Sequence, residues 1–163
     1  MTNQWGWGVK PVNEDDKDPE FAAHSKIISS RLKGLDDGPV TAAELAKGHV
    51  ETWLKTAGSN KEHRMIVRRI ARGTMRGMAE VGQDLPQTAR FLLKTVPGAA
   101  QELAVDAKDL TGWVLEGIAD VTLMAGPGPR GNILKMLEFD FPELGAQFAE
   151  VCRKAKVKQW WTK

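Results

Sequence analysis

Helix-start signals recur along this chain, whereas no segment alternates apolar and polar residues as a half-buried strand does. Proline at position 19, directly after Asp18, is typical of a helix entry, because the first helical position has no use for the N–H that proline lacks. The pair Ser59 and Glu62 has the spacing of a capping box, in which two side chains satisfy unpaired N–H groups reciprocally. These patterns predict an all-α fold, an irregular bundle of about six or seven helices with extended N-terminal and C-terminal arms.

Further boundary signals divide the chain into expected helices. Thr41 and Glu44 repeat the capping-box spacing, and Asp84 precedes Pro86 at the start of a short helix. The expected helices cover residues 18–34, 41–58, 59–82, a short segment from 84, 97–124, 133–139 and 140–151. Between 125 and 132, two prolines and three glycines predict a connector without regular structure.

The domain organisation follows from these limits. A chain of 163 residues can bury one ordinary core, at about 70% of its unfolded surface. We expect an extended N-terminal arm at 1–17, a helical domain at 18–152 and a basic, tryptophan-containing tail at 153–163. The single cysteine excludes an internal disulfide and a paired-cysteine zinc site. Neither a secretory signal nor an apolar run of membrane-spanning length is evident, which favours a cytoplasmic or particle-associated protein.

Charge is segregated along the chain. Residues 61–94 carry eight basic and three acidic side chains, whereas 95–151 carry three basic and nine acidic ones. Within the basic block, arginines recur at every fourth position and form one helix face, the arginine row, with Arg69 beside it. The arginine row consists of Arg64, Arg68, Arg72 and Arg76. Like charges at this spacing cost about 0.2 to 0.5 kcal/mol per pair, so the row predicts an anionic partner.

A row of acidic side chains in the expected helix 97–124 is one candidate for that partner. Its members are Glu102, Asp106, Asp109, Glu116 and Asp120. Under this interpretation the two rows pack side by side within the chain, and apolar contacts hold the helices together because exposed ion pairs contribute only about 0 to 1 kcal/mol each. The alternatives are external: the phosphates of a nucleic acid, or an anionic membrane surface.

Tryptophans gather at both ends of the chain. Trp5 and Trp7 lie among glycines in the N-terminal arm, and Trp160 and Trp161 lie in the basic tail with Lys154, Lys156 and Lys158. Tryptophan and arginine are enriched among the residues that anchor protein interfaces, so the ends are candidate docking segments for a protein partner. The simpler alternative is that both arms fold back onto the helical core.

The sequence contains few residue patterns that are typical of catalytic or metal sites. His24, His49 and His63 fall on different expected elements without metal-ligand spacing, and Cys152 shares an apolar face with Phe148, which is typical of a core residue. We predict no catalytic residue, no metal site and no cofactor, and no small-molecule substrate can be identified.

The function hypotheses therefore concern binding. The preferred one is a non-catalytic structural or adaptor component of a larger protein assembly, such as a virion or similar particle, docked through the tryptophan-bearing ends. The alternatives are a membrane-surface or membrane-remodelling protein that uses basic and tryptophan residues, and a nucleic-acid-binding protein that uses the arginine row.

Overall fold

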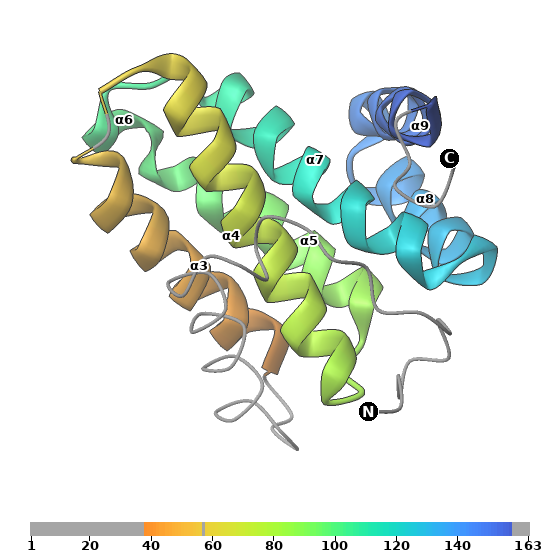
Figure 1. The fold of residues 1–163 in the computed structure, drawn as a ribbon. Coiled ribbons are helices and arrows are strands. Elements are labelled where there is room, and N and C mark those ends of the chain that lie inside the picture. The colour runs from red at the N-terminus through yellow and green to blue at the C-terminus, as the bar shows by residue number, and fades with distance from the viewer. Residues whose placement is uncertain (1–37, 57, 158–163) are drawn as a thin grey trace.

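The computed structural model describes residues 38–56 and 58–157. Within these ranges the fold is all-α, with six helices of 11 to 21 residues and no strand, which confirms the predicted fold class (Figure 1). The six are α3 (Gly38–Leu54), α4 (Asn60–Glu80), α5 (Leu85–Thr95), α7 (Ala107–Ala125), α8 (Pro127–Asp140) and α9 (Pro142–Val157). A 3-10 turn, η1 (Val96–Ala99), and a one-turn helix, α6 (Ala100–Leu103), connect α5 to α7. The expected helix at 18–34 and both terminal arms lie outside the described residues.

Two predicted helix starts are confirmed by their hydrogen bonds. Ser59 is the N-cap of α4, where its Oγ accepts a bond of 3.1 Å from the backbone N–H of Glu62. Asp84 caps α5 in the same way, and its Oδ1 accepts from the N–H of Gln87 over 3.0 Å. Gly82, which was expected to stop the arginine-bearing helix, lies just beyond α4 with φ +73°, a conformation that glycine adopts without strain.

The predicted start of α3 is wrong. Thr41 and Glu44 do not form a cap at its beginning, because helical geometry is already established at Gly38 and both residues lie inside α3. Pro39 fits this earlier start, since a proline in the first turn removes an N–H that has no partner within the helix. The helix also ends at Leu54, before the predicted limit at residue 58.

The long helix predicted for 97–124 is interrupted. Ala104 adopts the left-handed conformation, with φ 57° and ψ 41°, and ends α6. Asp106 then acts as the N-cap of a new helix, and its Oδ1 accepts from the N–H of Lys108 over 2.8 Å. The apolar periodicity continues across this break, which is why the pattern alone suggests one helix.

The predicted connector at 125–132 is also wrong. Gly126 caps α8 with φ 101°, and the helix begins at Pro127. Both Pro127 and Pro129 lie in the first turn, where no intrahelical bond needs their missing N–H groups. The final helix is found where it was predicted, and it continues past residue 151 to Val157.

The helices pack as a bundle around one main core. The most extensive contact joins α4 to α7, which run side by side through the centre of the molecule, while α3 and α5 pack together beside them (Figure 1). The helices α8 and α9 form a pair at one end and contact α5 and α7. Each long helix contributes fully buried side chains to the core, among them Val50, Ile70, Leu92, Ile118, Leu137 and Phe148. No described helix is long and apolar enough to cross a lipid bilayer.

Candidate functional site

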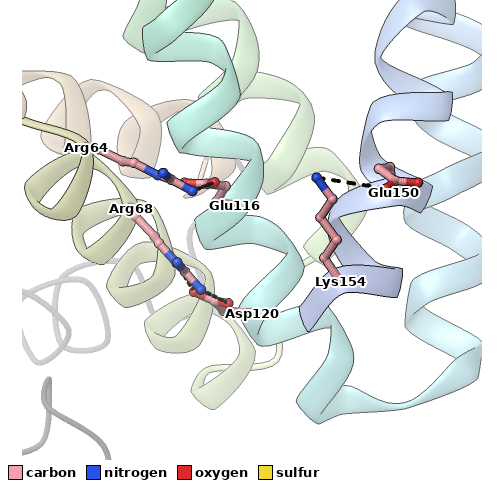
Figure 2. A network of polar contacts seen from close by, with 6 residues as sticks. All are labelled: Arg64, Arg68, Glu116, Asp120, Glu150 and Lys154. Carbon is pink, nitrogen blue, oxygen red and sulfur yellow. Dashed lines mark hydrogen bonds and ion pairs between the residues drawn. The ribbon is translucent and has the colours of Figure 1, made fainter. Parts of the chain in front are cut away.

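The arginine row of α4 faces acidic side chains of α7. Arg64 donates from Nε to Oε1 of Glu116 over 3.0 Å and from Nη2 to Oε2 of the same carboxylate. One turn further along, Arg68 makes the same two-point contact with Asp120, at 2.8 and 2.9 Å (Figure 2). Arg72 adds a third cation, with Nη1 at 3.3 Å from Oδ2 of Asp120. We call these five residues the charged seam.

The electrostatics of the charged seam vary with depth. The Arg64 side chain is 55% exposed, whereas Arg72 and Asp120 are 16% and 12% exposed. The hydrogen bonds to Glu116, together with its negative charge, raise the pKa of Arg64 above its already high ordinary value. The interactions of the charged seam should strengthen towards Asp120, where solvent screens least.

Gly117 explains why α4 and α7 approach so closely at the charged seam. A Cβ atom at this position would lie 2.4 Å from the carbonyl oxygen of Arg68, 2.7 Å from Cβ of Ala71 and 2.9 Å from the backbone N of Arg72. Two of these three atoms belong to the α4 backbone, which cannot rotate away. Gly117 lies between Glu116 and Asp120, so the contact that requires glycine also brings both carboxylates within reach of the arginines.

Only part of the predicted acidic row takes part in the charged seam. Glu102 belongs to α6, on the far side of the break at Ala104, so it does not share a helix face with Glu116 and Asp120. Asp106 caps α7, and Asp109 lies exposed in the first turn of that helix. Arg69 and Arg76 are half-buried on α4.

The basic C-terminal segment begins on α9. The side chains of Arg153 and Lys154 are 67% and 72% exposed, and both reach back to Glu150. Arg153 donates from Nε and Nη2 to the Glu150 carboxylate. Nζ of Lys154 lies 3.9 Å from Oε2 of the same carboxylate (Figure 2). The hydrogen bonds from Arg153 hold the pKa of Glu150 below its ordinary value. Lys156 belongs to α9, whereas Trp5, Trp7, Lys158, Trp160 and Trp161 lie outside the described residues.

The remaining candidates have structural surroundings. His49 is stacked on Trp53 one turn along α3, with ring centroids 5.8 Å apart, and burial lowers the pKa of His49. Cys152 is 4% exposed and packs in the core with Phe148, as predicted. Among the described residues, no group of three or more histidine, cysteine or acidic side chains is placed to hold a metal ion.

Two surface features were missed from the sequence. Phe139 on α8 is 86% exposed. A cleft of about 340 Å³ also lies between α8 and α9, with Leu134, Phe148 and Cys152 among its lining residues. The helical spacing could have revealed Phe139. It lies two residues after the buried Leu137, and side chains at that separation point to nearly opposite sides of a helix. This signal was missed because the predicted connector shortened the expected helix so far that its buried and exposed faces could not be distinguished.

Comparison with known proteins adds no family. The chain matches no protein-family model, and neither a curated protein nor a solved structure shows significant similarity to it.

Proposed function

We propose that this protein is a non-catalytic structural or adaptor component of a larger protein assembly, and that it docks through its tryptophan-bearing ends, chiefly the C-terminal one. The observation that carries the proposal is the course of α9 beyond the core. Among the residues whose burial the structure describes, Cys152 is the last that the core buries, and α9 continues through Arg153 and Lys154, whose side chains are largely exposed. The sequence that follows this exposed basic turn is KVKQWWTK.

The residue types in this segment suit a protein interface. Tryptophan presents a large apolar surface with one N–H donor, and burial of such a side chain stabilises a complex by several times as much as a typical interface contact. Basic side chains around the anchor steer it towards an acidic surface and raise the association rate. The exposed turn of α9 at Arg153 and Lys154 directly precedes this segment in the sequence.

The charged seam supports the same choice of surface. The guanidinium groups of Arg64, Arg68 and Arg72 already have carboxylate partners on α7, so an external phosphate would have to compete with bonds of charge-assisted strength. This favours docking through the ends over nucleic-acid binding through the arginine row. A salt-dependent gel shift that Arg68→Glu and Arg72→Glu abolish would reverse the preference.

Sedimentation velocity tests the proposal. The tagged full-length chain is purified at native expression level with its copurifying protein and compared with a Trp160→Ala/Trp161→Ala variant. We expect a stoichiometric complex for the parent chain and loss of that complex in the variant, with unfolding curves unchanged. Phe139→Ala, which truncates an exposed aromatic side chain of the described core, is the matched control and should retain the complex. A parent chain that sediments alone, or a double variant that keeps its partner, would overturn the proposal.

The exposed basic turn also favours a second candidate, binding to an anionic membrane surface. Each basic residue near such a surface contributes about 1 kcal/mol, and indole rings settle at the headgroup level. Flotation with vesicles of anionic lipid at low salt separates the two functions. Flotation of the parent chain, abolished by Trp160→Ala/Trp161→Ala, would support the membrane function, and failure to float would exclude it.

A further inference from the structure

The cleft between α8 and α9 has an apolar floor. Leu134 projects from α8, and Phe148 and Cys152 project from α9, where they are 1% and 4% exposed. The volume of about 340 Å³ is at the lower end of the roughly 300 to 1,000 Å³ of small-molecule sites, which are lined mainly by apolar side chains with a few polar groups. The floor therefore suits the body of a small apolar molecule.

Cationic groups line the same cleft. Arg130 on α8 and Arg153 on α9 both border it, one from each helix. Arg153 is bound to Glu150, whereas no described residue forms an ion pair with the guanidinium of Arg130. Arg130 is a half-buried residue and thus brings a charged donor to the rim of an apolar floor, a placement that favours an anion able to accept two parallel hydrogen bonds.

We propose that this cleft is a binding site for a small amphiphilic carboxylate, an aromatic or short aliphatic acid whose apolar body rests on Leu134 and Phe148 and whose carboxylate pairs with Arg130. Arg130 and Arg153 are the charged residues among the described lining of the cleft, and both are basic, which agrees with an anionic ligand. Arg153 borders the cleft and also belongs to the basic turn before the docking segment. The two proposals are tested at different residues, Arg130 for the cleft and Trp160 with Trp161 for docking, so either can fail without the other.

Binding of octanoate to the full-length chain tests the site, with octanamide as the neutral analogue of the same shape. Isothermal titration calorimetry should show octanoate binding at least about tenfold more tightly than octanamide. The reason is that a hydrogen bond between charged groups contributes more binding free energy than a neutral one, by an amount that corresponds to about this ratio of affinities. Arg130→Gln should remove this discrimination, and Arg130→Lys should keep part of it. Lys135→Gln, an exposed lysine on the same helix outside the cleft, is the matched control and should bind octanoate like the parent.

The position of Cys152 supplies a second readout. It is the single cysteine of the chain and lines the cleft, so its rate of reaction with a thiol reagent reports on occupancy. Octanoate should slow the labelling of Cys152. Ala149→Leu fills the cleft from an exposed helical position and should abolish the binding of both octanoate and octanamide.

Failure of octanoate to bind would overturn the proposal, and so would any one of three further results. They are equal affinity for octanoate and octanamide, discrimination that survives Arg130→Gln, and octanoate binding that leaves the labelling of Cys152 unchanged. If octanoate fails to bind and Trp160→Ala/Trp161→Ala alone accelerates the labelling, the cleft holds the tail of the chain itself and the carboxylate site is wrong.

Discussion

The contact at Gly117 gives the sharpest stability prediction. Gly117→Ala would place a methyl group 2.4 Å from the carbonyl oxygen of Arg68, about 1 Å closer than ordinary contact allows. Relief requires α7 to move away from α4, which loosens packing at the largest helix contact of the molecule. Such overpacking costs about 1 to 3 kcal/mol or more, set against a gain of about 1 kcal/mol because alanine is the better helix former.

A second glycine of the same helix isolates the packing cost. At Gly112 the added Cβ would lie 3.4 Å from Nε2 of Gln147, the movable end of a flexible side chain. Gly112→Ala should therefore be neutral or stabilising by up to about 1 kcal/mol. The two variants share the gain in helix propensity, so the difference between their free energies of unfolding should equal the packing cost, about 1 to 3 kcal/mol or more.

Urea denaturation followed by circular dichroism measures both variants against the parent chain. We expect Gly117→Ala to lower the midpoint and Gly112→Ala to leave it unchanged or raise it. If Gly117→Ala matches Gly112→Ala in stability, α4 and α7 do not approach each other as closely as described. The described geometry of the charged seam would then be wrong as well, because it depends on that contact.

Three further predictions concern local interactions. Ser59→Ala should lower the free energy of unfolding by about 1 kcal/mol through loss of the α4 cap, and Ser59→Thr should restore most of it in the same urea titration. A double-mutant cycle of Arg68→Ala and Asp120→Ala should give a coupling of about 0.5 to 1 kcal/mol that weakens as salt is added; a coupling of zero at low salt would contradict the two-point contact. Burial lowers the pKa of His49 below its ordinary value of 6.5, so the unfolded chain takes up a proton there at higher pH than the folded chain. The free energy of unfolding should consequently fall as the pH drops through and below 6.5, and His49→Gln, compared across that pH range, should reduce this fall.

Signals that act within one helix turn were predictable from the sequence. The caps at Ser59 and Asp84 depend on a side chain and an N–H three residues away, so short spacing suffices to find them. The same logic failed at Thr41, because a capping-box spacing also occurs inside helices and Pro39 permits an earlier start.

The errors elsewhere arose where local and tertiary effects compete. Apolar periodicity runs through Ala104, and the left-handed turn there could not be inferred from a pattern that both sides of the break share. The prolines after Gly126 suggested a connector, although prolines in a first turn are compatible with a helix. An internal partner for the arginine row is one of three interpretations of the sequence. Which acidic residues form that partner depends on tertiary structure, because Glu116 and Asp120 lie 52 positions from the arginines they bind and are brought to them by the close helix contact at Gly117. The tryptophan-bearing ends remain predictions.

Photo-crosslinking in the native cell tests the central claim most directly. A photoreactive amino acid is placed at position 160 in one form of the chain and at position 139 in another, where it replaces the exposed Phe139 of α8. We expect position 160 to crosslink to one partner protein in high yield and position 139 to give little crosslinked product. Crosslinking from position 139 to a partner, with none from position 160, would contradict docking through the C-terminal tryptophans.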